Sequence, residues 1–226
     1  MLQPSTLQFL RELKENNHKP WFDENRRRYE AVKKDYQQLV AALLAEMQRH
    51  DPTLAMLSVK DCTFRINRDI RFSADKSPYK TNLGISLSPY GKKLQMAGYY
   101  VHIEPGAAFV GGGLYMPEAP QLKKVRKEID YFYSDLRAVV EAPAFVRTYG
   151  DLDRDPGAVL SRPPKGYEAH NPAIEYLKLK SFTAVTTLDD ALLTQPALVQ
   201  ALTASLLDLQ PFIAFINRGL MAEDNE

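Results

Sequence analysis

The sequence predicts an α+β fold: a single domain over residues 1–226, with a central antiparallel sheet of about five strands and helices packed mainly on one face. Apolar residues recur at three-and-four spacing towards both ends of the chain, which is typical of helices. Residues 63–116 instead alternate between apolar and polar side chains, which is typical of strands, and short turns between the runs favour antiparallel neighbours. Because no flexible hinge divides the 226 residues, we expect one core.

Two helices are expected in the first fifty residues. Leucines recur at helical spacing from Leu7 to Leu13, before a pair of asparagines ends the run. A second and longer helix has Pro20 in its first turn and continues until Asp51, where its apolar stripe stops. That stripe consists of Phe22, Tyr29, Val32, Tyr36, Leu39, Leu43 and Met47.

Strands are expected to follow. Residues 63–73 predict the first strand, because apolar side chains occupy every second position over most of the segment. Two further alternating runs begin at Leu83 and Tyr99, with turn-forming residues between them. Three consecutive glycines at 111–113 indicate a bulge or a close approach by another backbone or a ligand.

The last part of the chain mixes helices with one more strand. Pro120 starts a third helix, and the proline- and glycine-rich residues 142–172 predict an irregular covering segment. Residues 176–188 alternate and then become rich in β-favouring side chains, so a further strand is expected there. A final helix begins near Pro196, and the acidic tail at residues 222–226 is expected to fray.

Composition and charge exclude several classes of protein. With 45% hydrophobic and 25% charged residues, the chain resembles an ordinary soluble globular protein. Its net charge of +1 argues against a protein that works mainly by neutralising a nucleic-acid backbone. No signal peptide and no stretch long and apolar enough to span a bilayer are recognised, so we expect a cytoplasmic protein without a membrane partner. The single cysteine, Cys62, excludes an internal disulfide, and core filling is its expected role.

One face of the predicted sheet gathers polar side chains. In the first strand Arg68 breaks the apolar face, and a guanidinium group there needs a carboxylate, backbone carbonyls or a bound anion. Guanidinium groups bind phosphate, sulfate or carboxylate oxygens through paired hydrogen bonds, so we interpret the face as an anion site. Alternatively, Arg65, Asp69 and Arg71 pair among themselves and with Glu104 on an ordinary wet face. The candidate ligand-binding side chains on this face are Arg65, Asn67, Arg68, Arg71 and Tyr100, with Lys178 and Lys180 from the later strand.

The loop at residues 73–81 adds further candidates. It supplies hydroxyl groups, ammonium groups, a phenol and a carboxylate, a composition suited to closing over a ligand. Its candidate ligand-binding side chains are Lys76, Tyr79 and Lys80. The alternative is a hydrogen-bonded surface turn, in which Asp75 caps local amides and Pro78 restricts the backbone.

His102 and Glu104 are the candidate catalytic pair. They are two residues apart on a predicted strand and therefore point the same way, as a general base and its orienting carboxylate would. Two ligands do not make a metal site, and the four histidines of the chain match no metal-ligand motif, so no metal is predicted. A purely structural histidine is the alternative.

Five segments together are similar to one known family. They read FLRELKENNHKPWFDENRRRYE from Phe9, FRINRDIRFSADKSPYKTNLG from Phe64, GYYVHIEPG from Gly98, GGGLYMP from Gly111 and AIEYLKLKSF from Ala173. On these segments the chain resembles the family catalogued as the domain of unknown function 2461, over nearly its whole length. The resemblance implies no reaction, substrate or cofactor, so it supports the choice of segments rather than a mechanism.

The leading functional hypothesis is a protein that binds a small anionic, phosphate-bearing ligand on the polar face. Whether it is an enzyme stays open; if it is, His102 acts as general acid or base in phosphoryl or acyl transfer, with the arginines stabilising the developing charge. No cofactor and no oligomeric state follow from the sequence.

Two alternatives remain. One is a nucleic-acid module in which the same basic segment contacts phosphates, while aromatic side chains stack on bases; we rank it below the small ligand. Its stacking candidates are Tyr79, Tyr99, Tyr100 and Phe109. The other is a protein-interaction scaffold whose polar face is a partner surface.

Overall fold

The computed structural model of the chain describes residues 1–91 and 94–222, and these form two compact units. The first unit comprises Met1–Leu87, Tyr100–Val110 and Thr187–Ala204. The remaining described residues make up the second unit. Of the predicted frayed tail, residues 223–226 lie outside the described part of the chain. The prediction of a single domain stays a prediction.

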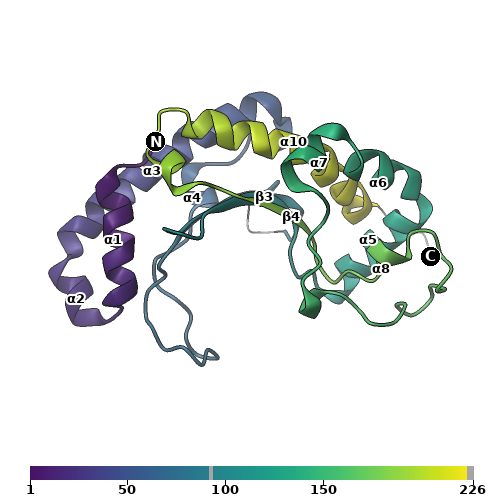
Figure 1. Ribbon diagram of the computed structural model, residues 1–226, viewed down its shortest axis with the longest axis horizontal. Helices are drawn as coiled ribbons and strands as arrows, with labels where there is room; N and C mark the ends of the chain where they lie inside the picture. The colour runs from purple at the N-terminus through teal and green to yellow at the C-terminus, as the bar shows by residue number, and fades with distance from the viewer. Residues whose placement is uncertain (92–93, 223–226) are drawn as a thin grey trace. The chain divides into compact units, whose positions relative to one another are not determined.

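In the first unit, helices follow the apolar spacing of the sequence (Figure 1). The predicted second helix is divided, because the Asn25 side chain donates to the Trp21 carbonyl and caps the shorter piece. The longest helix, α3, then packs against the first helix and against strand β1. The helical elements of this unit are α1 (Pro4–Glu15), α2 (Lys19–Glu24), α3 (Arg26–His50), the 3₁₀ turn η1 (Pro52–Leu54), α4 (Val59–Cys62) and α9 (Asp190–Leu193).

The described strands form one antiparallel sheet of four strands in the order β1-β2-β3-β4. Their bounds are β1 (Leu83–Leu87), β2 (Gly98–Ile103), β3 (Phe109–Leu114) and β4 (Phe182–Thr187). Along β2, Tyr99, Val101 and Ile103 are at most 1% exposed, whereas Tyr100 and His102 are half-buried. This alternation confirms the α+β prediction with helices packed mainly on one face.

The predicted strand at residues 63–73 is wrong. The segment makes only isolated bridges, at Thr63 and Asn67, and the Phe72 side chain is 95% exposed. Residues 66–68 instead pair with residues 78–80, through bonds from the Arg68 amide to the Pro78 carbonyl and from the Lys80 amide to the Ile66 carbonyl. Side chains add to this local pairing: Arg68 donates to the Ser77 carbonyl and Lys76 to the Ile70 carbonyl. Because these contacts satisfy the backbone locally, the alternating pattern does not extend the sheet.

The glycine triplet lies where neighbouring strands approach closely. A Cβ atom at Gly111 would lie 2.2 Å from the Ala184 carbonyl oxygen, and one at Gly112 would lie 2.3 Å from the Gly98 carbonyl oxygen. No side chain fits at these distances, so the expected close approach by another backbone is confirmed.

The second unit contains the helices that follow the sheet. The predicted strand from residue 176 begins only at Phe182, because Arg126 donates to the carbonyls of Leu177 and Leu179, which a strand partner would otherwise use. The predicted irregular segment at residues 142–172 also contains short helical elements. The elements here are α5 (Ala119–Tyr131), α6 (Tyr133–Val140), α7 (Pro143–Tyr149), η2 (Pro156–Ala158) and α8 (Ile174–Leu177).

The last helix, α10 (Leu198–Met221), is long and apolar enough to cross a membrane by length and composition. The prediction that no stretch meets this criterion is therefore wrong. A buried core helix passes the same test, and Leu202, Leu206 and Leu209 of α10 are fully buried inside the protein. Packing thus accounts for part of the apolar character of α10, whose apolar window is 44% buried.

Candidate functional site

A pocket of about 920 Å³ lies in the first unit. Its wall is formed by α2, α3, α4, the extended residues 63–69, residues 79–84 and the exposed face of β2. Six cationic side chains line it against two acidic ones, an excess of four positive charges. The cations are Arg26, Lys33, Lys60, Arg65, Arg68 and Lys80, and the acids are Glu30 and Asp69.

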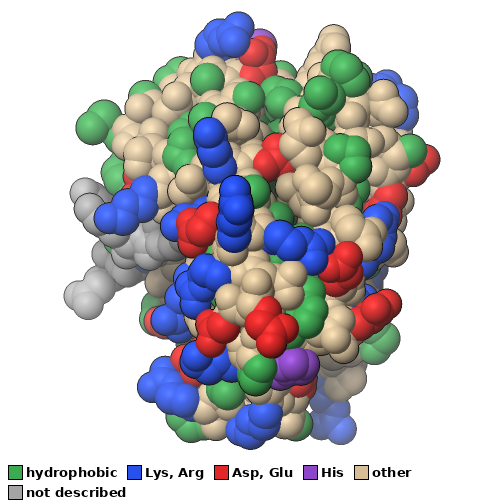
Figure 2. Space-filling view, turned by 90° about the vertical axis from the view of Figure 1, so that its left-hand side faces the viewer, with side chains coloured by type: hydrophobic (Ala, Val, Ile, Leu, Met, Phe, Trp, Pro, Cys, Tyr) green, Lys and Arg blue, Asp and Glu red, His purple; other side chains and the backbone are tan. Residues whose placement is uncertain are grey.

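This excess is local. Figure 2 shows a face of the molecule on which Lys and Arg side chains are interspersed with Asp and Glu, and the chain as a whole carries a net charge of only +1. A concave site lined by one sign of charge focuses its field on a counter-ion more strongly than the same charges on an open surface. The positive excess thus belongs to the lining of this pocket and not to the chain as a whole.

Aromatic side chains form the apolar part of the lining. The Phe22 and Tyr79 rings stack at 4.0 Å between centroids, and Tyr36 donates its hydroxyl proton to the Gly84 carbonyl. A Cβ atom at Gly84 would lie 2.7 Å from Tyr100 Oη, so a glycine there makes room for the Tyr100 ring over β1. The pocket thus combines cations with flat apolar surfaces.

Tyr100, His102 and Glu104 form a chain of hydrogen bonds along one face of β2 and its end. Tyr100 Oη lies 3.2 Å from His102 Nδ1, and His102 Nε2 lies 3.2 Å from Glu104 Oε2. The Phe109 ring stacks on the imidazole at 4.7 Å and 8°. Lys14 completes the chain with an ammonium group 3.0 Å from Glu104 Oε1.

Electrostatics assign the direction of these hydrogen bonds. Burial by itself raises the pKa of Glu104, but the hydrogen bonds from Lys14 and His102 outweigh it and hold that pKa below its ordinary value. An ionised Glu104 only accepts, so His102 Nε2 donates to it. In the tautomer with its proton on Nε2, Nδ1 is the acceptor for the Tyr100 hydroxyl group. Burial raises the pKa of Tyr100, which keeps the phenol protonated and able to donate.

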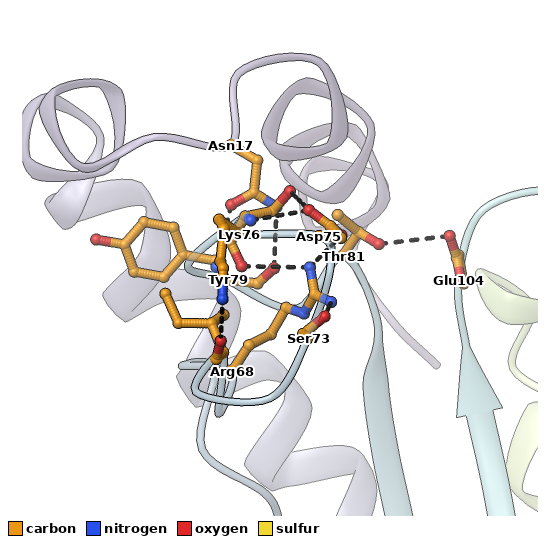
Figure 3. A network of polar contacts seen from close by, with 10 residues as sticks. Asn17, Arg68, Ser73, Asp75, Lys76, Tyr79, Thr81 and Glu104 are labelled. Atoms are coloured by element: carbon orange, nitrogen blue, oxygen red, sulfur yellow. Dashed lines mark hydrogen bonds and ion pairs between the residues drawn. The ribbon is translucent and has the colours of Figure 1, made fainter.

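The candidate Arg68 finds partners inside the loop at residues 73–81 (Figure 3). Its guanidinium group pairs with Asp75, and it donates to the Ser77 carbonyl at 3.2 Å. Hydrogen bonds from the Ser77 hydroxyl and amide, followed by the one from Arg68, lower the pKa of Asp75 to about 2. Of the partners expected for Arg68, the structure thus supplies a carboxylate and a backbone carbonyl. Arg68 also lines the pocket.

Two candidates of this segment do not line the pocket. Arg71 makes a two-pronged ion pair with Asp69, with N–O distances of 3.0 and 2.7 Å. Lys76 donates to the Ile70 carbonyl at 3.0 Å and closes the loop on itself. Asp75 accepts from the Ser77 amide at 2.8 Å, so the segment has the contacts of the hydrogen-bonded turn given above as the alternative.

Other candidates are brought together in the pocket. Arg65 is exposed and, among the described residues, makes no ion pair; its carbonyl accepts from Lys80 at 3.0 Å. Lys80 also lies 5.2 Å above the centre of the Phe64 ring. Asn67 pairs with Tyr79 in an isolated bridge, and both line the pocket.

The lysine pair lies elsewhere. Lys178 and Lys180 belong to the second unit, after α8 rather than in a strand, and neither lines the pocket. Lys178 pairs with Glu175 at 3.3 Å, and Lys180 donates to the Gly157 carbonyl at 3.1 Å.

Sequence reasoning missed the cations that the helices contribute. Arg26 and Lys33 are seven residues apart on α3 and so share one helix face, and both line the pocket. Their spacing indicated a shared basic face of the helix. Because acidic residues lie nearby in the sequence, that face was interpreted as solvated and not as a binding surface. Lys60 of α4 and Lys14 beside Glu104 carried no local signal, because only the tertiary fold brings them to the site.

Within the described residues, no group of three or more His, Cys, Asp or Glu side chains is placed to hold a metal ion. Cys62 is fully buried, which agrees with the core-filling role expected for it.

Comparison with known proteins agrees with the segments quoted above. Residues 5–215 match a family described as conserved hypothetical protein (DUF2461). No curated protein and no solved structure matches the chain. Because the match covers most of the 226 residues, and every quoted segment falls within it, the chain belongs to the DUF2461 family of conserved hypothetical proteins.

Proposed function

We propose that this protein binds a small anionic, phosphate-bearing ligand in the pocket of the first unit. The observation that carries the proposal is the excess of four positive charges in one concave site of about 920 Å³. Among the described residues, Lys33, Lys60 and Arg65 make no ion pair, although the charge of Arg65 acts on the Asp69 carboxylate. An entering phosphate group would supply the missing counter-charge.

The polar side chains of the pocket have complementary roles. Arg65 offers two parallel N–H groups to phosphate oxygens, and Lys80 adds a compact charge held close to it by the Arg65 carbonyl. Asn67 and the Tyr100 hydroxyl orient the ligand, and the aromatic lining accepts an apolar or ring-shaped portion next to the phosphate. The ligand class is therefore an organic phosphate small enough for the pocket, in a protein for which the cytoplasm remains the expected compartment.

Burial of the aromatic side chains favours this proposal over the nucleic-acid alternative. Tyr99 and Tyr79 are 1% and 6% exposed, and Phe109 is stacked on His102. A single-strand binder needs aromatic faces that are open to bases. A small ligand needs only the walls of the pocket.

The test compares two arginines six residues apart. Arg65→Gln removes a pocket cation, and the control Arg71→Gln removes an arginine that does not itself line the pocket, although its partner Asp69 does. Thermal unfolding is followed with inorganic phosphate, pyrophosphate, nucleotides, sugar phosphates and a short oligonucleotide at two salt concentrations. We expect one class of small phosphate to stabilise the parent and the Arg71→Gln protein.

In Arg65→Gln we expect the dissociation constant to rise about 10- to 100-fold, because hydrogen bonds to charged groups contribute about 1.5–3 kcal/mol. Equal loss in both variants, or no stabilisation by any small phosphate, contradicts the proposal. Stabilisation by the oligonucleotide alone, falling steeply with salt, would instead support the nucleic-acid module. If no ligand changes the thermal unfolding of the parent protein, the protein-interaction scaffold becomes the leading functional hypothesis.

A further inference from the structure

We propose that Tyr100 is a nucleophile activated by His102 and Glu104, so that the pocket hydrolyses phosphate monoesters through a covalent phosphotyrosyl group. The inference rests on the proposed binding of a phosphate-bearing ligand and names the chemistry that the pocket would perform on it. It extends the sequence hypothesis, in which His102 acts as general acid or base, by naming Tyr100 as the group that attacks phosphorus.

Three polar side chains lie in a row along β2 and its end. Side chains two residues apart on a strand point to the same side, so Tyr100, His102 and Glu104 form a continuous row. The contacts of 3.2 Å on each side of the imidazole make this row a hydrogen-bonded chain. A nucleophile, a base and a carboxylate that orients the base are the three parts of an activated nucleophile.

Within this row, the Tyr100 hydroxyl oxygen is the atom that remains available to a ligand. Both ring nitrogens of His102 are engaged, Nδ1 by Tyr100 and Nε2 by Glu104. Tyr100 Oη donates its proton to His102 and keeps its lone pairs, and Tyr100 lines the pocket. The phenol oxygen, rather than the imidazole, is thus the group positioned to attack a ligand.

The imidazole ring of His102, which is the proposed base, is held in place by its neighbours. Lys14 and Thr81 contact Glu104 Oε1 at 3.0 and 3.4 Å, which leaves Oε2 for His102. Stacking of Phe109 restricts rotation of the imidazole. The exposed fractions of the His102 and Glu104 side chains are only 15% and 17%, so water competes little for these hydrogen bonds. A ring held in one orientation in this way is typical of a catalytic proton acceptor and not of a chance contact on the surface.

The reaction balances without any oxidant or reductant. Tyr100 Oη attacks the phosphorus of the monoester, its proton passes to His102 Nδ1, and the bond from phosphorus to the ester oxygen breaks. The leaving oxygen takes the proton from His102. Water then attacks the phosphotyrosyl phosphorus and gives a proton to His102, which returns it to Tyr100 Oη as inorganic phosphate leaves. Arg65 and Lys80 stabilise the charge that develops on the phosphoryl oxygens.

The test uses p-nitrophenyl phosphate with the full chain, its Tyr100→Phe, His102→Ala and Glu104→Gln variants, and a matched control, Tyr149→Phe. Tyr149 donates its hydroxyl proton to the Ser205 carbonyl in the second unit, so this control also removes a hydrogen-bonded phenol hydroxyl, but away from the pocket. Release of p-nitrophenolate is measured, and after rapid acid quenching, peptide mass spectrometry locates any added phosphoryl group.

We expect the parent and the Tyr149→Phe control to release p-nitrophenolate and to carry the phosphoryl group on Tyr100. Tyr100→Phe should lose both the release and the adduct. His102→Ala should slow adduct formation about 10²–10⁴-fold, with partial recovery when free imidazole is added, a recovery that a merely structural histidine would not show. Glu104→Gln should lower kcat with little change in KM, because Glu104 is a positioning residue that does not line the pocket.

Binding of inorganic phosphate is measured separately by calorimetry. It distinguishes failure of the Tyr100 nucleophile from failure of the proposed binding function. Phosphate binding without release or adduct, release that survives in Tyr100→Phe, or an adduct on another side chain would overturn the nucleophile and leave the binding function standing. Absence of phosphate binding in the parent would overturn both.

Discussion

Arg65 and Arg68 stand three residues apart in the same extended segment, but they have different environments. Arg68 is paired with Asp75 and donates to a loop carbonyl, whereas Arg65 makes no ion pair among the described residues and faces the pocket. The sequence identified both as candidates, because a guanidinium group in an alternating segment needs a partner. It could not separate them, since the partner of Arg68 depends on how the loop at residues 73–81 folds back.

The contact between Asp75 and its neighbours predicts an acid-dependent loop. In the folded protein the pKa of Asp75 is about 2, below its ordinary value of 3.8. Its contribution to stability is therefore fully present above about pH 4 and is lost as the pH falls through about 2. An NMR titration of the Asp75 carboxyl group should show this low midpoint. Ser77→Ala should raise the midpoint, because the Ser77 hydrogen bonds are the largest cause of the lowered pKa.

Ser73→Ala is the matched control for this titration. The Ser73 hydroxyl lies 3.4 Å from Arg68 and is not among the groups that shift Asp75, so the midpoint should stay near that of the parent. An unchanged midpoint in Ser77→Ala would show that the loop contacts do not set the ionisation of Asp75.

At the scale of elements, the pocket wall depends on how the residues before β1 attach to the first two helices. The Asn17 side chain donates to the Tyr79 carbonyl at 2.9 Å and accepts from the Tyr79 amide at 3.0 Å, as a neighbouring strand would. Tyr79 then stacks on Phe22 of α2. One asparagine thus substitutes for a strand partner at Tyr79, in a segment that the sequence predicted to be a loop.

Asn17→Ala should detach this part of the wall. The Tyr79 amide and carbonyl lose both partners, and leaving such groups unsatisfied costs about 1–3 kcal/mol. We expect faster hydrogen exchange at the Tyr79 amide and a lower free energy of unfolding. The neighbouring variant Asn16→Ala is the control, since within the described part of the chain the Asn16 side chain bonds only to the Glu12 carbonyl of α1. Equal exchange at Tyr79 in the two variants would contradict this role for Asn17.

At the scale of the whole molecule, the two compact units share strands. Strand β2 begins in the second unit with Gly98 and Tyr99 and continues in the first from Tyr100 to Ile103. A strand cannot lose half of its hydrogen bonds without weakening the rest, so covalent continuity favours joint unfolding. The single-domain prediction is therefore open to a direct test.

We expect denaturant unfolding to show one transition. Fluorescence of Trp21, the single tryptophan of the chain, reports on the first unit, and hydrogen exchange of the Ile129 amide in α5 reports on the second. The two probes should give the same midpoint and the same free energy of unfolding. Separate midpoints would show two folding units and would contradict the single-domain prediction.

Periodicity in the sequence determined the four longest helices, α1, α3, α5 and α10, and three of the four strands. It also placed Tyr100, His102 and Glu104 on one side of β2 and its end, because those features depend on neighbours close in the chain. The tertiary structure alone decided that residues 63–73 leave the sheet, that Arg68 belongs to its own loop, and that Lys178 and Lys180 lie outside the pocket. It also brought Arg26, Lys33 and Lys60 beside Arg65, and Lys14 beside Glu104. These outcomes depend on contacts between residues far apart in sequence, whose energies no local pattern records.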